Sequence, residues 1–407
     1  MKKLISLLLC ALLLCPLSGC GRVEADLDIW VATDNHYISP TLHPDDEYFM
    51  KVLNNADGKI THYSVEIIDA LIADAKENLP DLLILSGDLT LNGARQSHLE
   101  LAEKLAELEK SGVQVLVIPG NHDLNSTGVS FENGQALAVE GVDGEGFKEI
   151  YKDFGYTEAI SRDEATFSYV AEAEGKLRIF MLDSNSLGKC RLQNDTYKWL
   201  EKELKAAKRG GYRTVAVTHQ NLFVHNELLS FGYQLYDAEK LLPLFQKHGV
   251  KCNFSGHIHT QSIVEEGGVT EIVTSAATMS PIQYGRVHYD GSSLSYEVCG
   301  LSVKEDGGNP HLADIKKYSA DFFEELSRNQ IYRGLAESGL SAADINLLAE
   351  TYAKINTLYF AGQRVDTSLF KEGLELWQKQ DSFVKSYIET MISDRGDDLK
   401  ITVNLTR

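Results

Sequence analysis

The chain has 407 residues, of which 43% are hydrophobic, and a formal net charge of −20. This length allows one large domain and a smaller one. The acidic balance and the lack of a basic stretch argue against a protein that binds long nucleic acids by electrostatic attraction. An acidic protein that acts on an anionic substrate needs a local positive centre, which bound metal ions would supply.

The N-terminus has the pattern of a secretory signal peptide. Lys2 and Lys3 precede an apolar run over Leu4–Leu14, which is too short for an ordinary membrane-spanning helix. The run ends in Leu17-Ser18-Gly19-Cys20, which resembles the lipobox of bacterial lipoproteins. This resemblance implies removal of residues 1–19, a lipid on Cys20 and a short tether over residues 20–26. We therefore expect an extracytoplasmic protein that is lipid-anchored to the bacterial cell membrane; ordinary secretion is the alternative.

From residue 27 to about residue 303, short apolar strands alternate with amphipathic helices, which predicts an α/β layered domain. After Phe254 the pattern changes to strands without intervening helices, so a mixed sheet or two packed sheets fit better than a purely parallel sheet. The expected strands are Asp28–Ala32, Leu82–Leu85, Gln114–Ile118, Leu177–Leu182, Thr214–Thr218, Lys251–Phe254, Thr270–Thr274, Gly285–Tyr289 and Leu294–Val298, and the expected helices are Ser64–Glu77, Gln96–Lys110, Thr196–Lys208 and Ala238–Lys247.

A polar segment with two glycines, Ser302–Pro310, is typical of a linker. The part beyond it, residues 310–407, is expected to form a small C-terminal helical domain with helices at Asp314–Ser327, Ala342–Asn356 and Phe383–Ser393. The last segment, Leu399–Leu405, alternates like a strand, which would allow it to pair with a sheet.

Five polar clusters each follow a predicted strand, where the loops of an α/β fold converge and ligands bind. The first, Asp34-Asn35-His36, places a carboxylate and an imidazole two residues apart, which suits a borderline divalent metal. In the second, Gly87-Asp88, the glycine would let the carboxylate turn inward and bridge two ions. Taken singly, either cluster also fits an ordinary turn or helix cap.

The third cluster, Gly120-Asn121-His122-Asp123, contains an amide that makes sense as a metal ligand where other ligands supply enough negative charge. His122 could then stay free of metal and donate a proton. The fourth is His219, which alone would be an ordinary polar residue. The fifth, Gly256-His257-Ile258-His259, is a strong metal signal, because two imidazoles follow a glycine that permits close backbone approach.

In this order, the five clusters resemble the calcineurin-like metallophosphoesterase superfamily over roughly residues 27–302. The chain is also similar to secreted bacterial lipoproteins that resemble class III cyclic-nucleotide phosphodiesterases. The resemblance implies an α/β four-layer sandwich of two packed mixed β-sheets flanked by helices. It also implies two divalent ions, for which this ligand set suits Mn, Fe, Zn or Co. One ion would be held by Asp34, His36 and His259 and the other by Asn121, His219 and His257, with Asp88 bridging both.

The function that this resemblance implies is dinuclear-metal-dependent hydrolysis of phosphate esters. A hydroxide between the ions would attack phosphorus, and His122 would protonate the leaving group as general acid. A small phosphodiester, of nucleotide or cyclic-nucleotide type, is the favoured substrate. A phosphomonoesterase shares every ligand and stays an alternative, as does a non-catalytic metal-binding lipoprotein.

Four further residues are candidates for substrate contacts. Asn92 follows Asp88 closely enough to touch a phosphate oxygen, or it is a turn residue before a glycine. His225 lies in a segment that could form the rim of the pocket, or it is a polar surface group. Tyr233 and Tyr236 in the same segment could stack on a nucleobase, or they could serve packing.

Overall fold

The computed structural model describes residues 25–44, 46–186, 190–303, 308–393 and 397–406. The expected signal peptide, Cys20 and most of the tether lie outside these ranges, so lipidation stays a prediction. Among the helices in these ranges, none combines the length and the apolar character that crossing a membrane requires.

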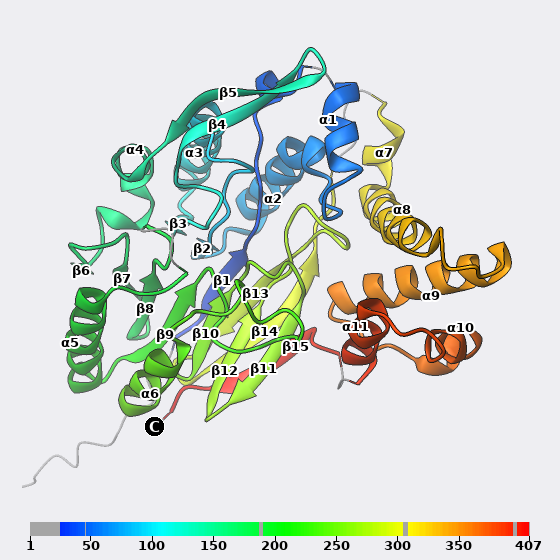
Figure 1. Cartoon of the computed structure of the whole chain (residues 1–407). Coiled ribbons are helices and arrows are strands. Elements are labelled where there is room, and N and C mark those ends of the chain that lie inside the picture. Colours follow the sequence, from blue (N-terminus) through cyan, green and yellow to red (C-terminus); the bar gives the residue numbers. More distant parts are fainter. Residues whose placement is uncertain (1–24, 45, 187–189, 304–307, 394–396, 407) are drawn as a thin grey trace, which may run out of the picture.

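Two mixed sheets form the centre of the molecule (Figure 1). In the first, three parallel strands are continued by an antiparallel set, whereas the second has a parallel core with antiparallel edges. The first sheet has the order β15 (Lys400–Asn404), β14 (Ser293–Gly300), β13 (Gln283–Tyr289), β1 (Leu27–Ala32), β2 (Leu82–Leu85) and β3 (Gln114–Val117). The second has the order β11 (Ser262–Glu266), β12 (Val269–Val273), β10 (Cys252–Ser255), β9 (Arg213–Thr218), β8 (Leu177–Leu182), β7 (Tyr169–Ala173) and β6 (Ser161–Arg162).

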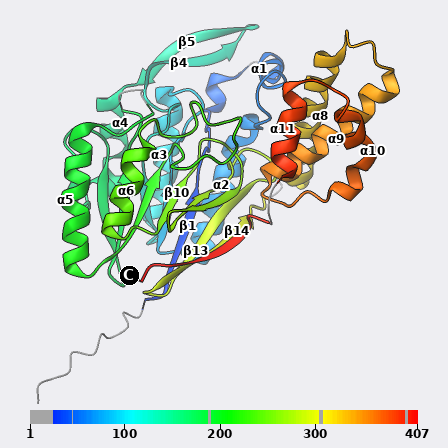
Figure 2. The same ribbon diagram turned by 60° about the horizontal axis from the view of Figure 1, so that its bottom comes forward.

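Helices cover the outer faces of both sheets (Figure 2). On the second sheet, Leu204 of α5 (Asn194–Gly210) and Phe245 of α6 (Ala238–His248) pack in one cluster with Phe180 of β8. On the first sheet, α2 (Ser64–Asn78) and α3 (Arg95–Glu109) contribute to the main core. The predicted α/β four-layer sandwich with two mixed sheets is therefore confirmed.

The central strands consist of almost unbroken apolar residues because both of their faces are covered. All four residues of β2 are buried, as are the last five of β9. Strands of this kind end abruptly at polar residues, and the parallel ones end at the same edge of their sheet. The predicted polar clusters after β1, β2 and β3 thus lie at one edge of the first sheet, and those after β9 and β10 lie at one edge of the second.

A two-stranded hairpin, β4 (Asn125–Glu132) and β5 (Gln135–Val142), was not predicted. Its turn, Asn133-Gly134, has positive φ at both residues, which is the conformation that a two-residue hairpin of this hand requires. The sequence therefore carried the turn signal. The flanking segment was missed because β5 is largely exposed and lacks a strong apolar alternation. The short elements α1 (Asp46–Leu53) and α4 (Gly144–Tyr151) were also not predicted.

The C-terminal region is helical, as expected, with its own core around Leu348, Trp377 and Ile388. The last strand then pairs antiparallel with β14, with Val403 opposite Leu294, so the chain returns to the first sheet. The helices of this region are α7 (Pro310–Ala313), α8 (Ile315–Leu335), α9 (Ala342–Phe360), α10 (Lys371–Trp377) and α11 (Phe383–Ile392).

Candidate metal centre

The polar clusters meet because the loops that follow β1 and β2 are hydrogen-bonded to each other. The backbone N–H of Asp34 donates to Gly87 O at 3.1 Å, and that of His36 donates to Asp88 O at 3.0 Å. From the second sheet, Gly256 N–H donates to His219 O at 3.1 Å. These contacts fix the positions of the side chains that the loops carry.

Five of the predicted ligands have an unusual backbone conformation. Asp34, His36, Asp88, His257 and His259 all have positive φ, between 43° and 69°. Residues other than glycine rarely adopt this region, and such strain concentrates at functional sites, where the surrounding structure enforces it. The strain turns these side chains toward one another.

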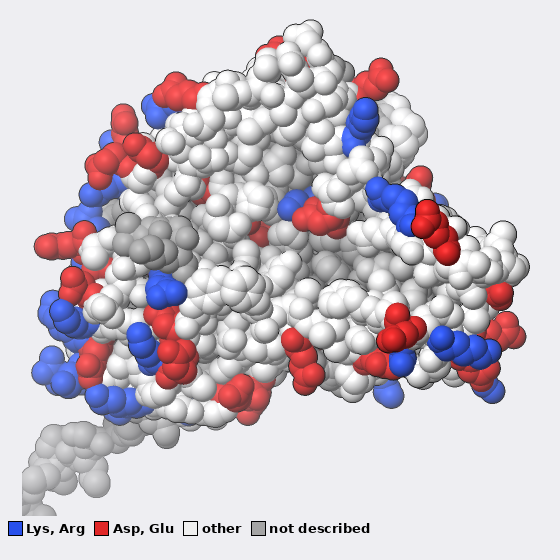
Figure 3. Space-filling model, in the orientation of Figure 1, with Lys and Arg blue, Asp and Glu red and all other residues white. Residues whose placement is uncertain are grey.

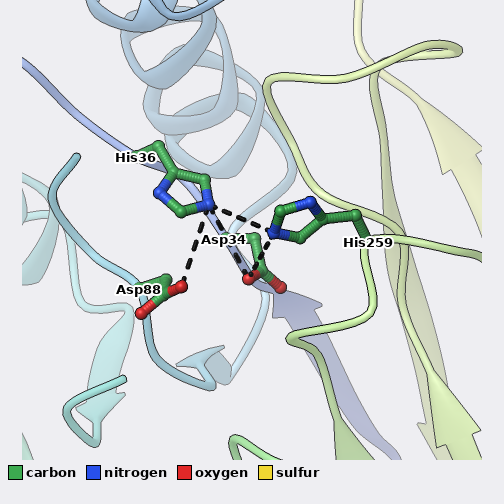
Figure 4. A group of neighbouring side chains, drawn as sticks. All are labelled: Asp34, His36, Asp88 and His259. Atoms are coloured by element: carbon green, nitrogen blue, oxygen red, sulfur yellow. Dashed lines mark hydrogen bonds and ion pairs between the residues drawn. The ribbon is translucent and has the colours of Figure 1, made fainter. Parts of the chain in front are cut away.

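The first group of side chains consists of Asp34, His36, Asp88 and His259, whose candidate ligand atoms lie within 4.8 Å of one another. Figure 4 shows the two imidazoles and two carboxylates pointing inward from their loops. The Nε2 atoms of His36 and His259 are 3.3 Å apart, and Nε2 of His259 is 3.3 Å from Asp34 Oδ1. Asp88 Oδ2 lies 3.8 Å from Nε2 of His36.

The second group consists of Asp88, His219 and His257. Nε2 of His219 lies 3.3 Å from Asp88 Oδ1 and 3.1 Å from the amide oxygen of Asn121. Asp88 thus belongs to both groups, one carboxylate oxygen facing each. The structure therefore brings together all seven predicted ligands.

The chemistry of this cluster fits divalent cations. Asp34 and Asp88 are no more than 1% exposed. Among the described residues, no group donates a hydrogen bond to Asp34 Oδ1 or Asp88 Oδ2. Their nearest neighbours are imidazole nitrogens, and a buried carboxylate oxygen without a hydrogen bond is costly, so a bound cation would satisfy both oxygens. The nitrogen and oxygen donors suit a borderline metal, but they do not select one.

The electrostatics of the cluster also favour positive charge. Burial opposes ionisation of Asp88, yet His219 and His122 hold the pKa of Asp88 well below its usual value. Burial alone would lower the pKa of His219, but the Asp88 carboxylate raises it to about 9. The cluster therefore retains ionised carboxylates although it is buried.

Backbone carbonyls fix the orientation of two histidines. Nδ1 of His219 donates to Ser86 O at 3.0 Å, and Nε2 of His257 donates to Gly232 O at 2.8 Å. Because a carbonyl only accepts, the other nitrogen of each ring is the one available to bind a metal once it has lost its proton. Outer contacts of this kind orient metal-ligating histidines in proteins.

Two glycines are required by close contacts within the site. A Cβ on Gly120 would lie 2.1 Å from the backbone nitrogen of Asp88. A Cβ on Gly256 would lie 2.0 Å from Thr33 Oγ1 and 2.4 Å from Asp34 Oδ2. The close backbone approach expected at Gly256 is present.

His122 lies beside the two groups and belongs to neither. Its Nδ1 donates to Leu91 O at 2.6 Å, and its Nε2 lies 3.9 Å from Asp88 Oδ2. The side chain is 38% exposed. One ring nitrogen is thus fixed by the protein, while the other faces the centre and is reachable from solvent.

The two candidate substrate-binding residues, Asn92 and His225, form hydrogen bonds within the protein. Asn92 donates to Val129 O at 2.9 Å and accepts from Ala94 N–H at 3.3 Å, which ties the loop to the β4–β5 hairpin. The rim position expected for His225 is wrong, because this residue is 2% exposed. Its ring nitrogens contact Ser262 Oγ at 2.9 Å and Glu271 Oε2 at 3.1 Å.

The aromatic residues near His225 do lie close to the centre or to solvent. The ring of Tyr233 is 5.2 Å from that of His257. Tyr236 is 43% exposed and lies 5.8 Å from the ring of Phe231, which is 87% exposed. The guanidinium of Arg191 lies 5.6 Å over the ring of Tyr236.

Sequence reasoning missed two charged residues next to the first group. Lys59 donates to Asp57 Oδ2 at 2.8 Å, and the same oxygen lies 3.6 Å from Nδ1 of His259. The segment Ala56-Asp57-Gly58-Lys59 reads as an ordinary turn, so no pattern in the sequence pointed to this contact.

Comparisons with known proteins agree with this geometry. Residues 299–398 match the C-terminal domain of cyclic nucleotide phosphodiesterase. A probable glycerophosphodiester phosphodiesterase GpdQ of Arcobacter nitrofigilis is 28% identical over 221 residues, which cover 50% of this chain and 68% of that protein. A probable cyclic nucleotide phosphodiesterase of Synechococcus is 24% identical over 241 residues, covering 58% and 78%.

Among solved structures, a dimetal phosphatase from Danio rerio has a TM-score of 0.51 and 11% identity, covering 67% of this chain and 96% of that one. At 11% identity, this similarity shows only that the two proteins share a fold. Residues 27–261, more than half of the chain, match the calcineurin-like phosphoesterase family. Together with the two groups of candidate ligands, this match shows that the chain is a metal-dependent phosphoesterase that belongs to the calcineurin-like phosphoesterase family.

Proposed function

We propose that this protein hydrolyses a small phosphodiester, a nucleotide or cyclic nucleotide, with two divalent ions bound at the centre. The observation that carries the proposal is the position of Asp88, whose two carboxylate oxygens face two separate groups of ligands. The names of both relatives and the match of the C-terminal region favour a diester over a monoester.

In this proposal, Asp34, His36 and His259 hold one ion, and Asn121, His219 and His257 hold the other. Asp88 contacts both. Bound divalent ions supply Lewis-acid chemistry and neutralise the charge that develops on a phosphoryl group. The protein's own contribution is to hold seven donors in place, five of them on strained backbone, so that little reorganisation is needed during the reaction.

His122 is proposed to protonate the leaving group. Because Leu91 O fixes the Nδ1 proton, Nε2 is the nitrogen that exchanges a proton with the substrate. Its position 3.9 Å from Asp88 Oδ2 places it beside the two groups of candidate ligands. The residue is exposed enough to be protonated again by solvent.

The organic part of the substrate is proposed to contact Tyr236 and Phe231. Exposed aromatic rings next to an arginine suit a planar nucleobase, which stacks on such faces. Figure 3 shows one face of the molecule hollowed at its centre, with Lys and Arg scattered among Asp and Glu rather than gathered in a patch. This distribution supports a small substrate rather than a long nucleic acid.

The location of the protein is a separate proposal that rests on sequence alone. The apolar run and Cys20 support removal of residues 1–19 and attachment of a lipid, which would anchor the enzyme at the outer face of the bacterial cell membrane. Replacing Cys20 by serine should then release the protein from the membrane fraction. Retention of the variant in that fraction would contradict the anchor.

The function is tested by comparing hydrolysis of bis-nitrophenyl phosphate with that of nitrophenyl phosphate, using protein reloaded with Mn²⁺. Faster cleavage of the diester, lost in Asp88→Asn, is the expected result. Asp195→Asn is the matched control, since Asp195 forms an exposed ion pair with Lys198 on α5. Preference for the monoester would favour a phosphatase, and failure to cleave either compound with both ions bound would favour a non-catalytic protein.

A further inference from the structure

The three histidines that face the centre from the loops after β9 and β10 differ in what holds their outer nitrogen. His219 and His257 each donate to a backbone carbonyl, which fixes the tautomer of the ring. At His259 the atom facing Nδ1 is instead a carboxylate oxygen, Asp57 Oδ2, at 3.6 Å. The side chain of His259 is 14% exposed.

The Asp57 carboxylate is held in place by a buried cation. Lys59 Nζ donates to Asp57 Oδ2 at 2.8 Å, and the lysine side chain is only 8% exposed. The Asp57 side chain is 47% exposed, and the Lys59 ammonium is the counter-charge that holds its carboxylate beside His259. A negative charge 3.6 Å from Nδ1 repels the lone pair of that nitrogen and favours a proton there. The lone pair of a neutral His259 ring is then on Nε2, which faces Asp34 and His36.

The loop that carries Asp57 is set by the C-terminal helices. Gly58 has φ of +101°, and a Cβ at this position would lie 2.3 Å from a ring carbon of Phe323 on α8. The ring of Phe323 packs 5.1 Å from that of Phe360 on α9. The carbonyl of Phe360 in turn accepts a hydrogen bond from the N–H of Gln261, two residues after His259, at 3.0 Å. One aromatic pair therefore supports both the Asp57 loop and the His259 loop.

We propose that Asp57, balanced by Lys59 and supported by Phe323, is a positioning residue that orients His259 for the ion that Asp34 and His36 also hold. The inference rests on the proposed metal centre and adds to it an asymmetry between the two ions. The ion at His259 depends on a side-chain carboxylate and on the C-terminal helices. The ion at His219 and His257 depends on backbone carbonyls.

The test is a calorimetric titration of metal-free protein with Mn²⁺, which reports two affinities without requiring activity. Loss of an outer carboxylate typically weakens binding of a metal through its histidine 10- to 100-fold. We expect Asp57→Asn to weaken one of the two affinities by about tenfold or more and to leave the other unchanged. Asp57→Glu should recover part of the loss, because it restores the charge.

One further variant and two controls separate positioning from folding. Gly58→Ala removes no charge but displaces the loop from Phe323, and it should reproduce the selective loss. Lys198→Met and Asp195→Asn, which remove an exposed ion pair, serve as controls and should bind both ions as the parent does. The melting temperature of each metal-free protein is measured beside the titration.

Unchanged affinities in Asp57→Asn would overturn the proposal. An equal loss at both sites together with a lowered melting temperature would also overturn it, because it would indicate a general structural role. These outcomes are distinct from failure of the proposed function, in which the parent protein binds two ions but cleaves no phosphate ester.

Discussion

The backbone N–H of His122 donates a hydrogen bond of 2.8 Å to Asp88 Oδ1. The residue proposed to transfer a proton is thereby attached to the carboxylate that both groups of ligands share. The imidazole cannot move relative to the centre without breaking this bond or the one between its Nδ1 and Leu91 O. The proposed acid is therefore placed by backbone contacts rather than by its own side chain alone.

If His122 is the general acid, His122→Gln should slow cleavage of a diester with an alkyl leaving group by about 10²- to 10⁴-fold. Cleavage of a nitrophenyl diester should slow much less, because nitrophenolate leaves without a proton. Rates with both esters and metal content are measured. His288→Gln on β13, with a half-exposed side chain, is the matched control. Equal losses with both esters would remove His122 from this role.

The stacking surface is tested by Tyr236→Ala. A stacked base contributes about 1–3 kcal/mol, so KM for a cyclic nucleotide should rise roughly 5- to 150-fold. KM for glycerophosphodiesters, which have no ring to stack, should stay the same. Tyr332→Ala on α8 removes another exposed tyrosine and should change neither. An equal rise in KM for both substrates would contradict a nucleobase-binding role of Tyr236.

Gly120→Ala should disrupt the centre, because the added methyl group would overlap the backbone of Asp88. Overpacking of this kind costs about 1–3 kcal/mol of folding free energy. We expect a lower melting temperature and a reduced metal content. Gly334→Ala is the matched control: in the described part of the chain, no atom beyond its own helix backbone and its chain neighbours lies within 4 Å of an added Cβ, and alanine favours the helix α8. Normal metal binding by Gly120→Ala would contradict this expectation, because it would show that the loops of Gly120 and Asp88 can move apart without loss of the centre.

His225→Ala should destabilise the protein without changing substrate binding. The variant leaves the buried Glu271 carboxylate without one of its donors, which costs about 1–3 kcal/mol. Chemical denaturation and KM are both measured. Increased KM with unchanged stability would restore His225 to the substrate pocket.

The buried His98, which is not one of the candidate metal ligands, should make the stability of the protein depend on pH. Burial lowers the pKa of His98 to about 4, below the ordinary value of 6.5. Between these values the unfolded chain binds more protons than the folded one, so stability increases with pH across this window, by about 3 kcal/mol for this group. His98→Gln should flatten that slope in denaturation measurements at pH 5 and 7. A slope identical to that of the parent would mean that folding does not change the protonation of His98.

The candidate ligands were predictable because their residue types are informative and because each follows a predicted strand. Asp34 and Asp88 follow neighbouring parallel strands and so were expected at one edge of one sheet, whereas His219 reaches them from the other sheet, which the strand pattern alone did not require. The contact between Asp57 and His259 could not be foreseen, since it depends on the path of a loop that the C-terminal helices support. His225 was misread for a related reason: its buried partner, Glu271, lies 46 residues away in the chain. The β4–β5 hairpin was missed although its turn was visible.

Because β15 pairs with β14, the helices α7–α11 form an insertion between neighbouring strands rather than an appendage at the end of the chain. Lys400 lies opposite Glu297, so the two attachment points of the insertion are close together. A unit that is tethered at both ends has little freedom to swing as a whole. Truncation at residue 303 would also strip an edge strand from the first sheet. A shortened protein without these helices should therefore be designed with a short turn that connects residues near 300 and 400. This connection would keep β15 paired with β14 and the sheet intact.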